Sequence, residues 1–184
     1  MVEILTGLLF LAAQFKYGLS PMLLFRGWPF VALLVAIAFI DLELRIIPDR
    51  LSLLGVVIGI GTSFFSGLSG VISSLEGAAL GFAVFYSLAW VYQKWSGKSG
   101  LGGGDIKLLA MLGAFLGPAG VFSTILISSV LGSIIGITWA LYEKRRQTQS
   151  LMQFAIPYGP FLVLGGLYYY LLGDLIWLPF TIPT

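Results

Sequence analysis

The sequence contains no cysteine and no histidine, and charged residues make up only 10% of its 184 positions. Without cysteine, the chain forms no disulfide, offers no thiolate nucleophile and builds no cysteine metal site. Without histidine, it lacks the commonest general base and a frequent metal ligand. Acid–base chemistry near neutral pH is therefore left to aspartate, glutamate, lysine or tyrosine, and we expect no metal site.

The scarcity of charge sets the chain apart from soluble proteins, in which charged residues make up about 25%. Hydrophobic residues account for 58% of the sequence, and the mean hydropathy is +0.99. Long apolar runs of this kind indicate membrane spans rather than one buried core. The formal net charge of +2 is too small to indicate a nucleic-acid partner. We predict a multi-pass membrane protein that contacts lipid and binds no nucleic acid.

The apolar segments lie near residues 2–16, 20–41, 51–68, 70–92, 105–116, 118–142 and 157–178. Helices are expected, because a lipid-exposed span must satisfy its own backbone hydrogen bonds. The segment 105–116 is short: about twelve residues rise roughly 18 Å, against a hydrocarbon core of about 30 Å. The pair Gly117-Pro118 breaks its end. We predict an all-α polytopic membrane helix bundle of about seven hydrophobic helices, one of them a short or partial span, in a single domain over 1–184.

The basic residues predict the orientation of the chain. If the N-terminus is cytoplasmic, the outside loops keep only Lys16 and Arg26. The inside loops then hold Arg45, Arg50, Lys94, Lys98, Lys107, Lys144, Arg145 and Arg146. This bias follows the positive-inside rule, so we predict a cytoplasmic N-terminus. Asp41, Asp49 and Asp105 then lie at the cytoplasmic ends of their helices.

A glycine-rich stretch at residues 100–107 leads into Asp105 and a hydrophobic helix. A carboxylate at the mouth of such a helix is costly in a bilayer, which makes Asp105 a candidate functional residue. Gly102, Gly103 and Gly104 have no Cβ, so their backbone allows close approach of another chain. A peptide must be extended to be cut, and these glycines would form a bare strip beside it. A plain flexible loop is the alternative interpretation.

Asp41 ends another apolar run and is the proposed partner of Asp105. Two carboxyl groups brought close cannot easily both ionise, and the pair titrates as a unit. The ionised member can take a proton from water while the protonated member polarises a peptide carbonyl. The two aspartates therefore predict the acid–base pair of a membrane aspartic protease, which needs no metal or cofactor for proteolysis.

Two nearby residues are supporting candidates with less certain roles. Asp49 follows Pro48 and precedes an apolar run, which is typical of a helix N-cap. Lys107 lies one turn or less from Asp105 and either anchors its helix at the membrane surface or tunes the charge of the aspartate pair. The sequence leaves both interpretations of Lys107 open.

Several stretches of the chain resemble motifs of the type IV prepilin peptidases, which are GxGD-type membrane aspartyl proteases. Residues 39–49 resemble the first aspartate motif, and residues 102–110 resemble the second. Residues 112–117 continue the second motif, and residues 156–161 resemble the start of the last helix of the family. By this resemblance, Asp41 and Asp105 would be the catalytic pair.

The resemblance also implies substrates and a location. The substrates would be type IV prepilins or secretion-system pseudopilins, which lose a short basic leader at the cytoplasmic face of the bacterial inner membrane. Longer members carry another membrane helix and a cytoplasmic domain before the segment that resembles residues 2–10. We therefore expect a short form without that domain. Many members also N-methylate the product, so S-adenosylmethionine is expected only if that activity is retained.

The same residues are also compatible with two other functions. Membrane aspartates also serve in proton- or cation-coupled transporters, and a protein of this kind could be a non-catalytic scaffold of a pilus or secretion system. Against transport, the acids cluster at one membrane face, and no internal repeat or midplane break is visible in the sequence.

Overall fold

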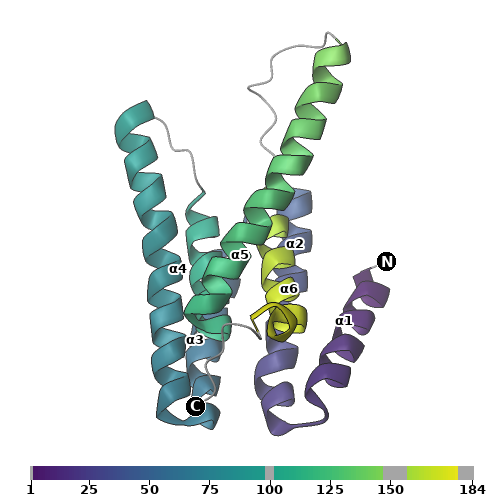
Figure 1. Cartoon of the computed structure of the whole chain (residues 1–184), viewed down its shortest axis with the longest axis vertical. Helices are drawn as coiled ribbons and strands as arrows, with labels where there is room; N and C mark the ends of the chain where they lie inside the picture. The colour runs from purple at the N-terminus through teal and green to yellow at the C-terminus, as the bar shows by residue number, and fades with distance from the viewer. Residues whose placement is uncertain (1, 98–101, 147–156, 178–184) are drawn as a thin grey trace.

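The computed structural model describes residues 2–97, 102–146 and 157–177, and these residues are almost entirely helical, with no strand among them. The helices are, in chain order, α1 (Val2–Tyr17), the π-helical turn η1 (Leu23–Gly27), α2 (Trp28–Leu44), α3 (Asp49–Ser63), the 3₁₀ turn η2 (Phe64–Ser66), α4 (Gly67–Ser96), α5 (Gly103–Arg146) and α6 (Gly159–Trp177). Figure 1 shows them as one elongated bundle. The predicted all-α fold is confirmed.

Three stretches of the described chain are long and apolar enough to cross a membrane: Leu23–Leu44, Asp49–Ser96 and Gly103–Trp139. The second of these contains both α3 and α4, joined through η2. A shorter apolar helix covers Gly159–Gly173. Large hydrophobic side chains are exposed along the outside of the bundle, as lipid contact requires, and Val57 at 68% exposure is an example. The prediction of a membrane helix bundle is confirmed.

A break at Gly117 divides α5 into two parts. Gly117 has φ 71° and ψ −176°, which is not helical, and Pro118 follows it. The first part, residues 103–116, is here named the half-helix. The second part, residues 118–146, turns back beside it (Figure 1). The two apolar segments predicted at 105–116 and 118–142 correspond to these two parts.

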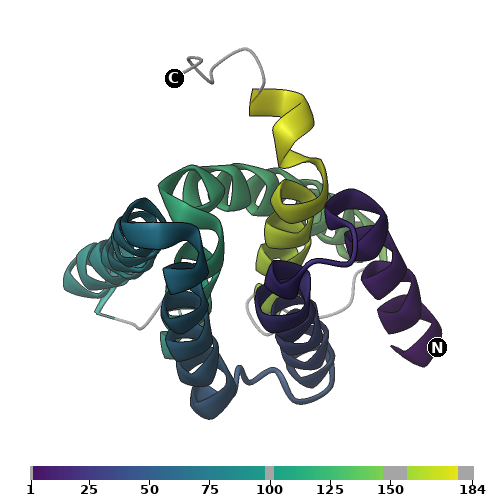
Figure 2. The same ribbon diagram turned by 90° about the horizontal axis from the view of Figure 1, so that it is seen from below.

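The half-helix forms the centre of the bundle. Nine of its residues between Ile106 and Phe115 are buried, the exception being Lys107, so this helix is enclosed on almost every side. A helix that is hydrophobic all round belongs in the interior of a bundle. Helices α3, α4 and α6 pack directly on α5, and side chains of α2 join the same hydrophobic cluster. Helix α1 lies at the edge, beside α2 and α6 (Figure 2).

Helices α4 and α5 approach each other closely at a pair of glycines. A Cβ atom added to Gly77 would overlap the carbonyl of Gly113, and a Cβ atom added to Gly113 would overlap the backbone of Gly77. Small residues at such positions allow two membrane helices to pack backbone against backbone. This contact fixes the half-helix against α4.

The two ends of the bundle are formed by different elements. The last turn of α2 and the first turns of α3, α5 and α6 meet at one end, here named the aspartate end (Figure 1). The opposite end contains η1, the end of α3 and the break at Gly117, and is named the arginine end. Figure 1 also shows that α5 begins below the level reached by the end of α4 and by the second part of α5. The start of the half-helix is therefore recessed between two longer helices.

Candidate active site

Asp41 lies in the last turn of α2, and its side chain is only 5% exposed. The helix ends one turn later at Arg45, which has the left-handed φ of 55° and donates its backbone N–H to the Asp41 carbonyl at 2.9 Å. The Asp41 carboxylate accepts a hydrogen bond of 3.0 Å from the backbone N–H of Gly159. A buried carboxylate needs such a donor, because burial without one is costly.

Gly159 is a site residue that sequence reasoning missed. It is the first residue of α6, where backbone N–H groups have no partner within the helix and are free to bind an anion. A Cβ atom at this position would overlap the Asp41 carboxylate. The sequence did offer a signal, since Gly159 lies within the motif at residues 156–161, but a glycine at a helix start does not reveal which acid it contacts.

Asp105 is the third residue of α5, and two hydrogen bonds to the backbone of Gly102 close the turn around it. The Asp105 N–H donates to the carbonyl of Gly102 at 3.1 Å, and the Gly102 N–H donates to the Asp105 carboxylate. A side chain at the third helical position that bonds back to the N-cap residue is the second half of a capping box. Asp105 is thereby fixed at the helix entrance, partly buried.

Asp41 and Asp105 both lie at the aspartate end, and the charge of Asp41 acts on Asp105. They come from different helices, and each has its own backbone donor, Gly159 for Asp41 and Gly102 for Asp105. The turn after α2 packs on the start of α5, since a Cβ atom at Gly104 would lie 2.7 Å from that of Ile47. Two carboxyl groups can share a proton and perform acid–base chemistry once they come within hydrogen-bond distance.

The three glycines before Asp105 have different surroundings. Gly104 is tightly packed against Ile47, and a Cβ atom at Gly102 would lie 3.0 Å from an Asp105 carboxylate oxygen. Around Gly103 no atom of the described residues lies within 4 Å of the Cβ position. Of the three glycines, Gly103 has the most open backbone. The sequence predicts that all three allow close approach of another chain, so the accessible backbone is shorter than expected.

Asp49 and Lys107 form an ion pair with each other at the aspartate end. The prediction that Asp49 caps α3 is wrong: Pro48 occupies the N-cap, and Asp49 is the first residue of the helix and makes no cap bond. The Asp49 carboxylate instead accepts a hydrogen bond from the Lys107 ammonium. Lys107 therefore reaches towards α3, and its described partner is Asp49 rather than either of the paired aspartates.

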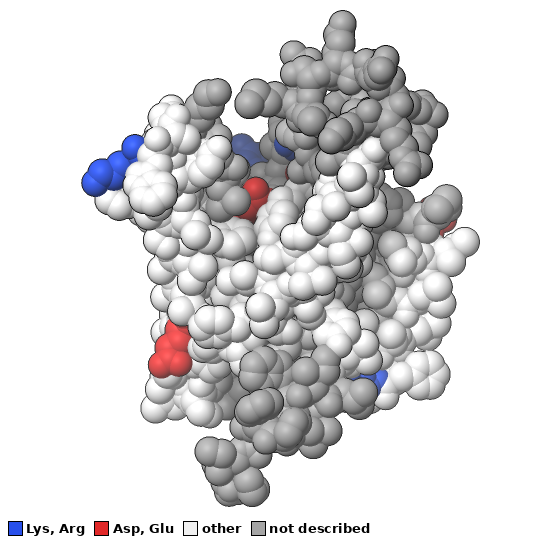
Figure 3. Space-filling model, turned by 45° about the horizontal axis from the view of Figure 1, so that its top comes forward, with Lys and Arg blue, Asp and Glu red and all other residues white. Residues whose placement is uncertain are grey.

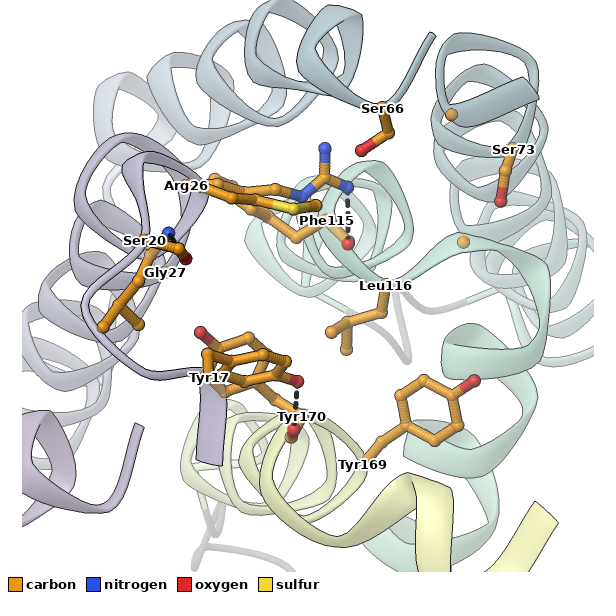
Figure 4. A pocket seen from close by; sticks show the side chains of 14 residues that line it. Tyr17, Ser20, Arg26, Gly27, Ser66, Ser73, Phe115, Leu116, Tyr169 and Tyr170 are labelled. Atoms are coloured by element: carbon orange, nitrogen blue, oxygen red, sulfur yellow. Dashed lines mark hydrogen bonds between the residues drawn. The ribbon is translucent and has the colours of Figure 1, made fainter. Parts of the chain in front are cut away.

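The position of Arg26 also differs from the prediction. The sequence predicts it in an outside loop as an orienting charge, but it lies in η1, which continues directly into α2. Its guanidinium points into the bundle at the arginine end, beside a cavity of about 270 Å³ lined by residues that include Tyr17, Ser66 and Tyr170 (Figure 4). This cavity lies at the end opposite the aspartates, and its wall contains neither of them.

The aspartate end contains its own open space. Figure 3 shows acidic and basic atoms inside a hollow, whereas most of the surrounding visible surface is uncharged. A cavity of about 370 Å³ is lined by Ser129, Gly132, Ser133, Tyr158 and Phe161. Tyr158 directly precedes Gly159, and its hydroxyl shares a hydrogen bond of 2.9 Å with Ser128. This cavity therefore lies between the start of α6 and the second part of α5, and its described lining includes neither Asp41 nor Asp105.

Comparison with known proteins gives matches over most of the chain. Proteins named prepilin leader peptidase/N-methyltransferase are 35% identical in Xanthomonas campestris pv. campestris over 90% of this chain, 36% identical in Aeromonas hydrophila over 96%, and 39% identical in Myxococcus xanthus over 79%. The aligned parts amount to 56%, 59% and 43% of those proteins. The chain thus spans about half the length of the relatives it matches.

No solved structure matches the chain significantly. The profile of the type IV leader peptidase family, Peptidase_A24, matches residues 28–137, and this range contains both Asp41 and Asp105. The matched range also includes α3, α4 and the half-helix, which hold the recessed aspartate end together. The chain therefore belongs to the type IV leader peptidase family.

Proposed function

We propose that this chain is an aspartic endopeptidase that removes the short basic leader from type IV prepilins or related pseudopilins. The observation that supports this most directly is the location of Asp41 and Asp105 at the same end of the bundle, where the charge of Asp41 acts on Asp105 and each carboxylate has a backbone N–H donor. The family match supports prepilin processing, since the relatives are named for it.

In the proposed reaction, a water molecule lies between the two carboxyl groups. The ionised aspartate takes a proton from the water as its oxygen attacks the scissile carbonyl carbon, and the protonated aspartate donates a hydrogen bond to the carbonyl oxygen. The tetrahedral intermediate then collapses, the C–N bond breaks, and the amine leaves with a proton from the acid. Backbone bonds from Gly159 and Gly102 hold the two side chains, so little reorganisation is needed during the reaction.

The substrate must present an extended backbone to these carboxylates. Gly103 offers an open backbone position two residues before Asp105, where an extended peptide could approach without meeting a side chain. The half-helix begins below the ends of α4 and of the second part of α5 (Figure 1), and we propose that a substrate reaches it while its own hydrophobic helix remains in the membrane. The scissile bond would then lie at the junction between the leader and that helix.

We further propose that the aspartate end faces the cytoplasm, in a bacterial inner membrane. Arg45, Arg50, Lys94 and Lys107 all belong to helix ends or turns on this side of the bundle, as the positive-inside rule expects for cytoplasmic segments. The relatives are also named N-methyltransferases, an activity that would use S-adenosylmethionine. The proposed proteolytic step requires no cofactor.

Single replacement of the aspartates tests the proposal. Asp41→Asn and Asp105→Asn should each abolish leader removal from a co-expressed prepilin, measured as a mobility shift, because one neutral amide cannot complete the acid–base cycle. Asp49→Asn is the matched control, since it removes a carboxylate at the same end that pairs with Lys107. Full cleavage by either of the first two variants would refute the assignment.

The same variants separate peptidase action from the other functions. A proton relay needs acids at successive depths, whereas Asp41 and Asp105 both lie at one end of the bundle. Proton-coupled uptake into vesicles without any proteolysis would support a transporter. A scaffold predicts that a chain with both Asn replacements still supports pilus assembly when the pilin is supplied already cleaved.

A further inference from the structure

The break at Gly117 frees two carbonyl groups at the end of the half-helix. In an unbroken helix the Ala114 carbonyl would accept from residue 118, but Pro118 has no N–H. The turn of the chain at Gly117 likewise separates the Phe115 carbonyl from its normal donor. Buried carbonyls without partners are costly, so this end of the half-helix needs donors from elsewhere in the bundle.

Arg26 supplies most of those donors. Its Nη2 donates to the Phe115 carbonyl at 2.7 Å and to the Ala114 carbonyl at 3.3 Å, and Figure 4 shows the guanidinium directed at this helix end. The Ala114 carbonyl also accepts from the buried hydroxyl of Ser74, on α4, at 2.6 Å. The guanidinium further lies over the Phe115 ring, 5.8 Å from its centroid.

Arg26 also reaches a third helix. Its Nη1 donates to the Gly59 carbonyl, near the end of α3, at 3.3 Å. All of these described bonds go to backbone carbonyls, which carry the partial negative charge of a helix C-terminus. A cation is therefore well suited to this position, and the guanidinium fork can serve two helix ends at once.

Because Arg26 lies in the same helical segment as Asp41, its contacts also affect how Asp41 is placed relative to Asp105. Residue Trp28 continues η1 into α2 with helical φ and ψ of −65° and −47°, so Arg26 and Asp41 belong to one continuous helical segment. At 1.5 Å per residue, about 22 Å separate Arg26 from Asp41, and about 15 Å separate Phe115 from Asp105. The long Arg26 side chain spans the difference. The segment η1–α2 and the half-helix run antiparallel. Arg26 joins them at the arginine end, and they carry Asp41 and Asp105 at the aspartate end.

We propose that Arg26 is a positioning residue that clamps the half-helix to the helix carrying Asp41 and so sets the register of Asp105 against Asp41. This inference rests on the proposed function only for its catalytic consequence. The clamp itself is a structural relationship between two helices. Arg26, which the distribution of basic residues predicts in an outside loop, thereby has a role in the reaction.

The kinetic test compares Arg26→Met, Arg26→Lys and the control Lys16→Met in purified enzyme. Lys16 is a cation at the same end of the bundle, but its described hydrogen bond goes to the Tyr170 carbonyl on α6. Arg26→Met should lower kcat by about tenfold to 100-fold per folded enzyme, since a displacement of about 1 Å has effects of that size, with little change in KM. Arg26→Lys should recover part of the loss, and Lys16→Met should retain activity.

A second measurement is independent of proteolysis. Because the chain has no cysteine, Asp105→Cys introduces a unique thiol at the site. We expect its labelling rate with a small maleimide to change several-fold when Arg26→Met is added, and to change little with Lys16→Met. If labelling changes while the aspartate variants prove the chain is not a peptidase, the clamp stands without its catalytic role. Unchanged labelling and unchanged kcat in folded Arg26→Met would overturn the proposal.

Ser74→Ala provides the same test if Arg26→Met does not fold. It removes one of the two donors to the Ala114 carbonyl and leaves the Arg26 bonds to Phe115 and Gly59 in place. The change in labelling rate should have the same direction as in Arg26→Met and be smaller. A Ser74→Ala variant with wild-type labelling and wild-type kcat would contradict the idea that donors at this helix end position Asp105.

Discussion

The backbone N–H of Gly159 donates a hydrogen bond of 3.0 Å to the carboxylate of Asp41. This bond joins the first turn of α6 to the last turn of α2 and gives a buried acid its described donor. The free N–H groups at a helix start favour a negative charge nearby. The contact explains how a carboxylate that is 5% exposed is held in place at the aspartate end.

Gly159→Ala should therefore impair the site directly. The added Cβ atom would overlap the Asp41 carboxylate, so either the acid or the start of α6 must move. We expect leader cleavage to fall by about tenfold or more, the effect typical of a misplaced catalytic group. Gly61→Ala, in α3, is the control, because nothing lies within 4 Å of its Cβ position. Equal activity of the two variants would show that the Gly159 contact is unimportant.

Breaking the Lys107–Asp49 pair should have a small effect on stability. The two side chains are 32% and 57% exposed, and exposed ion pairs contribute about 0–1 kcal/mol. Lys107→Met and Asp49→Asn should each lower thermal stability in detergent only slightly, and the double variant should lose no more than the larger single loss. Complete loss of cleavage in Asp49→Asn would instead assign a catalytic role to Asp49.

Gly113→Ala should destabilise the bundle where α4 and α5 touch. Its Cβ atom would overlap the backbone of Gly77, and overpacking of this kind costs about 1–3 kcal/mol. Gly136→Ala, on the same long helix, is the matched control, since its Cβ position is open. Alanine in an open helical position should be neutral or stabilising by up to about 1 kcal/mol. Comparison of unfolding temperatures in detergent measures the difference.

Gly117→Ala should lower the free energy of unfolding by more than the strain in its backbone angles alone. A positive φ with extended ψ, a region almost closed to residues other than glycine, costs about 1–3 kcal/mol, and Gly67→Ala, with φ 74°, ψ −168° and open space at its Cβ position, measures that cost separately. At Gly117 the new Cβ atom would also lie 2.6 Å from the Ser73 hydroxyl. Adding Ser73→Ala should restore part of the loss. No recovery in the double variant would show that the Ser73 contact does not contribute.

Local features of the sequence predicted much of the fold. Apolar runs located the helices, because each membrane helix must satisfy its own backbone and present apolar side chains to lipid. The pair Gly117-Pro118 predicted the break in α5, since proline removes a backbone donor at a defined position. The pairing of Asp41 and Asp105 as a catalytic unit stays a prediction, which the Asn variants test.

Other features depended on partners distant in sequence and could not be predicted this way. Arg26 bonds to carbonyls of Gly59 and Phe115, and a carbonyl acceptor is present at every residue, so it leaves no signature in the sequence. Asp49 was assigned to a cap because Pro48 and an apolar run are local signals, whereas its actual partner, Lys107, belongs to another helix. Gly159 was overlooked for the same reason.

The sequence by itself determined that this protein is a bundle of membrane helices with a broken fifth helix and two candidate acids, because hydrophobicity, proline and rare intramembrane charge act locally. The tertiary structure decided that the half-helix lies at the centre and that its entrance meets the end of α2. It also decided which backbone groups hold each carboxylate. These relationships arise from the close packing of α4 on α5 and from donors such as Arg26 and Gly159, whose effect exists only once distant segments are in contact.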